Sequence, residues 1–559
     1  MSSFQARIES VYSKEGISMT GGSLESICHL YESTLQFLAM VYEVVAGGWH
    51  DVADVTSTNG STVYANVTSA FLLIAQPFSV YQTNLAKLEK KHSAISQQMV
   101  AKDIQQAVGG VSNSIGILQD ATEKLKGLAP FIFPLAEAAV GRFELMTGGY
   151  RTAENLQAID GLMKSHAGEL SIAIRTLSAA MTSDSHSFAD TFDDQHVLCA
   201  LEVLKVAGIF QRCLADIEIK SREQMTMLRE RMVSFASQEN AFLESSAKSF
   251  MLPDSLSVVE IDSFITKAVL SGLDDEGNAQ LLQRLGSKDS SMAVVYPESK
   301  DAVAGLASSC HAFVFDVCCA VPRKRLANVS NMPCWTEASD TNAYDSYGTL
   351  PQSYITLVGE HMLALVQALE PFASDPVSLA LADEVMGGVQ AVAKQAWREV
   401  ATATGVTDSV VPTLMNGKEL MKYVSSGFED SGELDMEEDD DEDMDAATKA
   451  SASFCNKWLD VVGLAVTGFL LEKILRIPKL TPKGCEHLSV DLNYLVNVLA
   501  ALGVSGHPHP LVSHVAELAV MDCEDLQAQI RSRDRNIPFE GAVLSIEQRV
   551  ALVRGIPVN

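Results

Sequence analysis

Apolar residues recur at steps of three and four along most of this chain, and this spacing limits the folds that it can adopt. From Leu488 to Leu502 a leucine returns at every such step, and Gly503 follows the last one. Steps of three and four place side chains on one face of an α-helix, and a glycine in that position is typical of a helix end. The same spacing recurs from Leu24 to Val45 and from Ile355 to Leu369. The predicted fold class is therefore all-α.

Two prolines upstream of the leucine-rich helix mark a break in the chain. Pro478 and Pro482 bracket the break, and Thr481 is the expected N-cap of the helix that follows it. Another apolar helix is predicted before the break, starting near Trp458. Within the leucine stripe Asp491 is the only charged residue, so this helix must be covered on most sides.

Helix signals dominate the rest of the chain as well. Short β-branched runs do not form the alternating set that a sheet needs, and no repeat of roughly 20 to 50 residues is visible, which argues against armadillo and tetratricopeptide arrays. A polar loop is predicted from Trp49 to Asn66. Long helices separated by polar loops predict an elongated rod of stacked helical bundles. Five segments are expected: helical bundles at 1–128 and 129–326, a helical segment at 327–428, an acidic linker at 429–452 and a carboxy-terminal helical domain at 453–559.

The chain of 559 residues is strongly acidic, with a formal net charge of -30. A nucleic-acid surface is excluded because phosphate binding needs clustered Lys and Arg. Glu429 to Asp445 contains 12 acidic residues and no basic one, and self-repulsion predicts a disordered linker there. Calcium or a basic partner is the alternative for this run, although the Asp-x-Asp-x-Asp-Gly spacing of a calcium loop is missing.

Cysteine usage and hydropathy predict the compartment. Ten cysteines include no Cys-x-x-Cys pair, which is typical of buried thiols in a reducing compartment. The amino terminus has no signal-peptide core, and the apolar run from Val461 to Leu471 is far shorter than the roughly 20 residues of a membrane span. The chain is expected to be soluble or peripheral.

Histidines near the carboxy terminus are the strongest candidates for chemistry. His507 and His509 alternate with two prolines, and further possible ligands stand nearby at His514, Cys485, His487 and Cys523. A structural zinc site needs four ligands at definite spacings, whereas prolines in this pattern more simply mark a turn between helices. An all-α enzyme or metal-binding protein that uses the His507/His509 region is the alternative function. Phosphate-binding and nucleophile-elbow motifs are absent, so no catalytic residue, cofactor or metal is predicted.

Two apolar helices are sparsely charged on both faces, and these are the candidate partner surfaces. They start at Tyr354 and at Lys483. Most leucine stripes are internal core, but a helix with two apolar faces can dock on another subunit. The candidate interface residues are Tyr354, Met362, Tyr494, Asn497 and Ala501.

The residue order in the carboxy-terminal helix pair is distinctive. It runs Trp458, Ile474, Leu475, Ile477, Pro478, Leu480 to Pro482, Leu488, Asp491, Tyr494, Leu495, Asn497, Val498 and Ala501 to Gly503. Earlier stretches continue the pattern, at Leu30 with Tyr31, at Pro77 to Glu89 and at Tyr354 to Phe372. In this order the chain resembles the family of the seventh subunit of the conserved oligomeric Golgi complex.

The resemblance implies a non-enzymatic scaffold of stacked helical bundles in a vesicle tether. It implies assembly with the fifth, sixth and eighth subunits, and contact through the complex with SNAREs, small GTPases and vesicle coats. The expected role is retrograde transport within the Golgi, Golgi organisation and maintenance of glycosylation, with peripheral attachment to the cytoplasmic face of the Golgi membrane and a cytosolic pool. Members of the family carry a long amino-terminal region before the position of Leu24, and this sequence starts almost directly there, so either the gene model is truncated or the region is lost.

Overall fold

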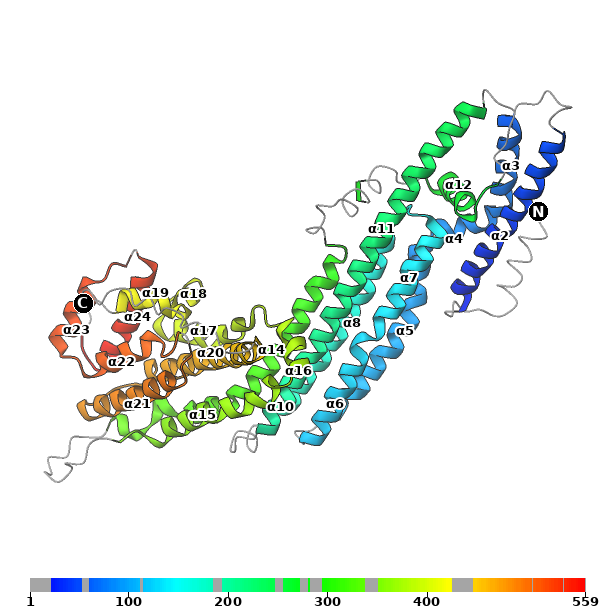
Figure 1. The fold of residues 1–559 in the computed structure, drawn as a ribbon. Coiled ribbons are helices and arrows are strands. Elements are labelled where there is room, and N and C mark those ends of the chain that lie inside the picture. Colours follow the sequence, from blue (N-terminus) through cyan, green and yellow to red (C-terminus); the bar gives the residue numbers. More distant parts are fainter. Residues whose placement is uncertain are drawn as a thin grey trace. The chain divides into compact units, whose positions relative to one another are not determined.

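The computed structural model describes residues 22–52, 60–110, 114–183, 194–246, 255–271, 280–281, 294–336, 350–424, 446–504, 506–535 and 537–557. Every regular element within these ranges is a helix, which confirms the predicted all-α class (Figure 1). The acidic run from Glu429 to Asp445 lies outside the described residues.

The chain divides into two compact units, each assembled from three separate stretches of sequence. Unit 1 comprises 1–107, 124–171 and 209–306, and unit 2 comprises 108–123, 172–208 and 307–559. The predicted five segments follow one another along the chain, and that division, like the elongated rod, stays a prediction.

Unit 1 contains several long helices and a short one. They are α2 (Gly22–Val52), α3 (Gly60–Ala75), α4 (Ser79–Thr83), α5 (Leu85–Val108), α7 (Ile132–Thr147), α12 (Val258–Leu270), and the larger parts of α8 (Thr152–Ser183) and α11 (Leu204–Ser246). Helix α12 lies against α2, α3 and α4, as Figure 1 shows near the N mark. The predicted polar loop from Trp49 to Asn66 is wrong at both ends, because α2 continues to Val52 and α3 already begins at Gly60.

The buried face of α2 follows the predicted spacing almost to its end. Its members from Leu24 to Tyr42 are buried: Leu24, Ile27, Tyr31, Leu35, Leu38 and Tyr42. Val45 was expected to complete the set, but it is 37% exposed and Ala46 is buried in its place. The drift agrees with a helix of 3.6 residues per turn, in which steps of three and four alternate only approximately.

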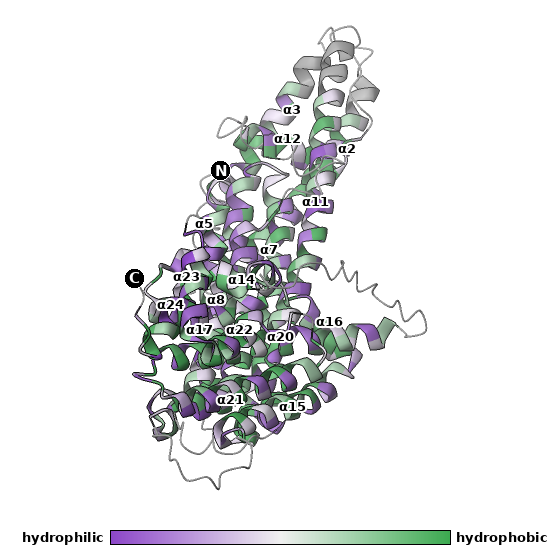
Figure 2. Cartoon of the chain, turned by 90° about the vertical axis from the view of Figure 1, so that its left-hand side faces the viewer, coloured by the Kyte–Doolittle hydropathy of each residue, from purple (hydrophilic) through white to green (hydrophobic). Residues whose placement is uncertain are grey.

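Unit 2 contains most of the shorter helices. They are α10 (Asp194–Glu202), α15 (Ser353–Ala373), α16 (Pro376–Asp383), α17 (Lys394–Thr404), α18 (Val411–Met415), α19 (Gly417–Val424), α20 (Ala446–Leu475), α21 (Pro482–Ala501), α22 (Pro510–Val520), α23 (Cys523–Ser532) and α24 (Pro538–Val553). Helices α6 (Ile115–Leu128) and α14 (Pro297–Leu326) contribute residues to both units. Figure 2 shows hydrophilic and hydrophobic residues side by side along the helices, as expected where each helix buries one face.

Helix α20 is the centre of unit 2. It packs against α15 and α17 and is buried almost all round between Trp458 and Leu475. Small residues allow the close approach, since a Cβ atom on Gly468 would lie 2.9 Å from the Cβ of Ala396. A helix that is apolar on every side has to be enclosed by others, and α20 meets this requirement within the unit.

One described helical stretch, from Pro297 to Asn331, is long and apolar enough to cross a membrane by length and composition. Its apolar window is 61% buried inside the protein. Core helices of globular proteins have the same length and composition, so the stretch does not by itself indicate a membrane span.

Candidate functional site

The contact between α15 and α21 holds three of the five predicted interface residues. Tyr354 and Met362 are buried, with 7% and 0% of their surface exposed. The Tyr354 hydroxyl donates to Oδ2 of Asp491 at 2.8 Å, and the backbone N–H of Gln352 donates to Oδ1 at 2.7 Å. Burial raises the pKa of Asp491, and these two hydrogen bonds oppose the rise. Tyr354 and Met362 therefore serve the chain's own packing.

Tyr494, the third residue of this contact, and the remaining two residues lie nearer to solvent. Tyr494 is half-buried, and its ring packs on Gly359, where an added Cβ would come within 2.8 Å of Cε1. Asn497 and Ala501 are exposed on α21. The interface role stays a prediction, and the exposed pair Asn497 and Ala501 is the part of it that a partner could reach without a rearrangement.

The leucine stripe of α21 forms the buried side of the same helix. Its first four members are fully or nearly fully buried: Leu488, Leu492, Leu495 and Leu499. Thr481 caps the helix by accepting from the N–H of Gly484 at 3.1 Å, with Pro482 in the first turn. Gly503 has a φ of 65°, the left-handed conformation of a helix end. The predicted boundaries of this helix are confirmed.

The break before α21 joins three distant segments of unit 2. The N–H of Leu480 donates to the carbonyl of Val553 and the N–H of Thr481 donates to the carbonyl of Trp335, both at 2.9 Å. Gly484 lies against the same segment, and a Cβ there would be 2.4 Å from the Trp335 carbonyl oxygen. These contacts define the elbow, residues 476–481, as a fixed junction.

The histidines of the alternative metal-site hypothesis have separate structural partners in the fold. Nε2 of His507 lies 3.0 Å from Oδ1 of Asp460. His509 is fully buried, its Nδ1 accepts from the N–H of Leu511 at the start of α22, and its ring lies 4.8 Å from that of Trp397. Burial lowers the pKa of His509 to about 3, so the ring is neutral. Both histidines hold helices in place.

His514 belongs to a separate cluster. Its Nε2 lies 3.0 Å from Oε1 of Glu547, which also accepts from Nη2 of Arg533 at 2.9 Å. Burial opposes ionisation of Glu547, but its hydrogen bonds to His514 and Arg533 prevail and lower its pKa. Across the described ranges no group of three His, Cys, Asp or Glu side chains is placed to hold a metal ion. The alternative of a metal-binding protein or enzyme using the His507/His509 region receives no support.

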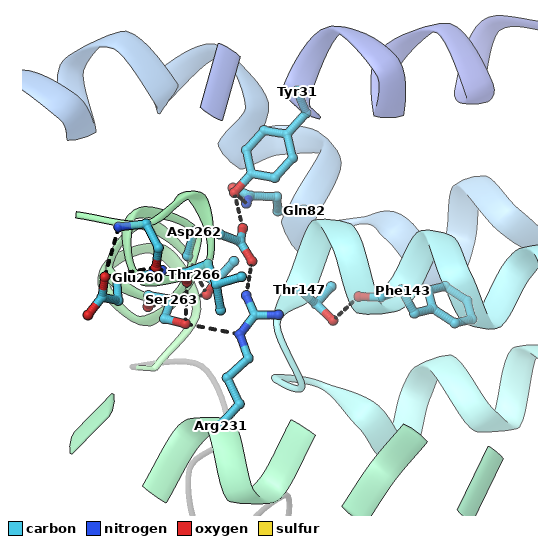
Figure 3. A network of polar contacts seen from close by, with 11 residues as sticks. Tyr31, Gln82, Phe143, Thr147, Arg231, Glu260, Asp262, Ser263 and Thr266 are labelled. Carbon is cyan, nitrogen blue, oxygen red and sulfur yellow. Dashed lines mark hydrogen bonds and ion pairs between the residues drawn. The ribbon is translucent and has the colours of Figure 1, made fainter. Parts of the chain in front are cut away.

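A buried polar network in unit 1 was not foreseen from the sequence (Figure 3). Asp262 on α12 accepts from the hydroxyl of Tyr31 on α2 at 2.8 Å and from Nη2 of Arg231 on α11. Gln82 on α4 donates to the Tyr31 oxygen at 3.1 Å. Burial raises the pKa of Asp262 to about 6, although the guanidinium of Arg231 opposes the rise. The network joins α12 to α2, α4 and α11. It could not be predicted from a local sequence motif, because Tyr31 and Asp262 are 231 positions apart.

Comparison with known proteins identifies the family. A family model described as Golgi complex component 7 (COG7) matches residues 2–401. The chain belongs to this family. The resemblance seen in the sequence is thereby confirmed, although the matched residues end before Trp458 and so do not include the carboxy-terminal helix pair on which it chiefly rests.

Several relatives share the printed name Conserved oligomeric Golgi complex subunit 7. The protein of Arabidopsis thaliana is 22% identical over 456 residues, which cover 77% of this chain and 47% of the relative. The protein of Homo sapiens is 20% identical over 485 residues, covering 84% and 54%. A shorter match of 53 residues to the protein of Dictyostelium discoideum is 42% identical. The chain spans about half the length of the first two relatives.

Proposed function

We propose that this chain is a non-enzymatic structural subunit of the conserved oligomeric Golgi complex. The observation that carries the proposal is the family match over residues 2–401, together with relatives that are named as subunit 7 of this complex. The proposed role is vesicle tethering in retrograde transport within the Golgi, and through it Golgi organisation and maintenance of protein glycosylation.

The way the polar side chains are used supports a scaffold. Buried carboxylates suited to acid–base chemistry are engaged in holding helices together: Asp491 binds Tyr354, and Glu547 binds Arg533 and His514. A catalytic site instead positions such groups to face a substrate pocket. Assembly with other subunits requires exposed helix faces, such as the face of α21 that carries Asn497 and Ala501.

The proposed partners are the fifth, sixth and eighth subunits of the complex. SNAREs, small GTPases and the vesicle coat would be reached through the assembled complex. The proposed location is the cytoplasmic face of the Golgi membrane, to which the chain attaches as a peripheral protein, in exchange with a cytosolic pool.

Affinity capture tests this proposal. An epitope-tagged full chain is expressed in cells, captured, and probed for the fifth, sixth and eighth subunits, while microscopy locates the tag. We expect the three subunits to be enriched and the tag to coincide with Golgi markers. A folded chain that captures none of them would overturn the assignment.

A variant pair tests where the partners bind. Asn497→Arg with Ala501→Arg places two charges on the exposed face of α21, and Glu486→Arg, exposed on the same helix, is the matched control. If this face is an interface, the first variant loses subunits without a change in melting temperature and the control keeps them. Retention of all subunits by the first variant would move the interface elsewhere.

A further inference from the structure

Unit 2 contains an open hollow of about 1020 Å³ beside the amino-terminal half of α20. Its walls come from the α18–α19 corner, from α20 and from the segment that leads into α22. Ligand sites in proteins fall in this range of volume, so the hollow is large enough for a short stretch of peptide.

The rim of the hollow is basic. Lys418 on α19 and Lys449 and Lys457 on α20 line it, and all three are exposed. Within the described parts of the chain, Lys418 and Lys449 have no carboxylate partner, whereas Lys457 lies 3.2 Å from Asp383 in an exposed pair that contributes little. A basic rim is unexpected on a chain whose net charge is -30.

Asp460, the acidic residue of the lining, contacts two other side chains of the protein. Oδ1 of Asp460 lies 3.0 Å from Nε2 of His507, and Oδ2 accepts from Nε2 of Gln390 at 2.8 Å. Asp460 keeps its negative charge and offsets one of the three lysines, which leaves two formal positive charges on the lining. The lining carries a net positive charge that is available to a ligand.

The deeper wall combines apolar surface with a buried histidine. Met415, Leu464 and Val504 contribute the apolar part. His509 is also part of the lining; because its Nδ1 accepts a hydrogen bond and its ring is neutral, the proton lies on Nε2. This buried Nε2 makes no hydrogen bond of good geometry and lies next to Gly417, another lining residue, while the Leu414 backbone lies near enough to the ring to oppose the fall in its pKa. A ligand that fits must bring acceptors, negative charge and an apolar group.

We propose that this hollow binds a short acidic peptide segment of a partner protein, with carboxylates on the three lysines and an apolar side chain on the wall formed by Met415 and Leu464. Charge complementarity selects the ligand, because the rest of this acidic chain repels it. The site is additional to the proposed role as a complex subunit and does not depend on it.

Fluorescence anisotropy with the purified full chain tests the proposal. The probe is a fluorescein-labelled peptide of sequence Glu-Asp-Leu-Met-Asp-Glu, and the control probe is Gln-Asn-Leu-Met-Asn-Gln. We expect saturable binding of the acidic probe, about tenfold or more tighter than the neutral one, and weaker binding as salt is raised. Equal binding of the two probes would overturn the proposal.

Charge reversal at the rim locates the site. Lys418→Glu with Lys449→Glu should weaken binding by about tenfold or more, whereas Lys479→Glu, an exposed lysine outside the hollow, should leave it within about twofold. A melting curve confirms that each variant is folded. Undiminished binding by the double variant would overturn the proposal. Binding that appears only after residues 429–445 are deleted would show that the chain's own acidic run occupies the hollow, and would overturn the assignment to a partner.

Discussion

Both units bury charged side chains, since unit 2 buries Glu547 with Arg533, but they differ in the tryptophans and histidines of their cores. Unit 1 buries charged side chains that bridge distant helices, such as Asp262 with Arg231 and Glu89 with Arg142. The core of unit 2 includes three fully buried tryptophans, Trp335, Trp397 and Trp458. It also contains the buried histidines His311, His361 and His509, whose pKa values burial lowers.

This difference follows from the length of the helices and what holds them in register. Long helices in contact along a stripe can slide by a turn at little cost in apolar contact, and a buried charged pair penalises every register but one. In unit 2 close backbone approaches also fix the packing, such as that of Gly208, at the start of α11, to the carbonyl of Leu381 on α16. A neutral histidine can hold two helices together there with one hydrogen bond to a nearby acceptor. His361, for example, donates from Nε2 to the carbonyl of Cys318 at 2.8 Å.

Lowering the pH should produce the largest difference in stability between the two units. Burial lowers the pKa of His311 and His361 to about 4 and that of His509 to about 3, from an ordinary 6.5. Below pH 6.5 the unfolded chain binds protons that folded unit 2 does not, so unit 2 loses stability as the pH falls towards 4, by up to about 1.4 kcal/mol per histidine per pH unit.

Protonation of Asp262 has the opposite effect on the stability of unit 1. The folded pKa of this carboxyl is raised from 3.8 to about 6, so between these values the folded unit binds the proton first and its contribution to stability grows as the pH falls. Amide protection factors, corrected for intrinsic exchange and compared at pH 7 and pH 5, should drop further in unit 2 than in unit 1, where Asp262 opposes the effect of His166, a buried histidine whose pKa burial also lowers. Equal losses in both units would contradict the comparison.

The second largest loss of stability is expected when a charge is placed in the core of unit 2. Leu495→Asp removes a fully buried leucine, which costs roughly 2–5 kcal/mol, and adds an unpaired carboxylate. Urea unfolding followed by tryptophan fluorescence should show loss of the unit 2 transition. Leu363→Asp, at a leucine that is 48% exposed on α15, is the matched control and should unfold close to the parent midpoint.

Removal of the charge in unit 1 should cost somewhat less. Asp262→Asn leaves Arg231 without its anionic partner, and loss of one member of a buried pair costs roughly 3–5 kcal/mol, reduced here because the Arg231 side chain is 21% exposed. The double variant Asp262→Leu with Arg231→Met should recover most of the loss in urea unfolding. If it recovers nothing, the pair contributes net stability and not only register.

The smallest effects come from a matched pair of glycines. Gly208→Ala would place a Cβ 2.1 Å from the Leu381 carbonyl oxygen in unit 2, and the forced shift should cost roughly 1–3 kcal/mol. Gly168→Ala in α8 of unit 1 meets nothing within 4 Å and should stabilise by roughly 0.5–1 kcal/mol. Thermal denaturation of both variants checks the signs. Two variants of the same sign would show that the close approach relaxes freely.

The features predicted correctly from the sequence are those that local physics determines. Thr481, Pro482 and Gly503 bound α21 because caps and left-handed ends depend on neighbouring residues only. Burial of Tyr354 could not be foreseen, because Asp491, which receives its hydroxyl, is 137 positions away.

The polar network of unit 1 was missed for the same reason. A tyrosine on an apolar stripe shows that it is buried, but not which distant carboxylate it will meet. The histidine hypothesis failed on a different point: proximity in sequence did not predict that His507 and His514 would bind different carboxylates, Asp460 and Glu547.

The elbow before α21 has a consequence for synthesis on the ribosome. The N–H of Thr481 donates to the carbonyl of Trp335, which is translated before Thr481. The N–H of Leu480 donates to the carbonyl of Val553, which is translated after it. The N–H of Leu480 therefore stays without its native partner while the intervening residues are translated, and contacts between positions so far apart form slowly. The junction of unit 2 is therefore complete only after Val553 has been translated.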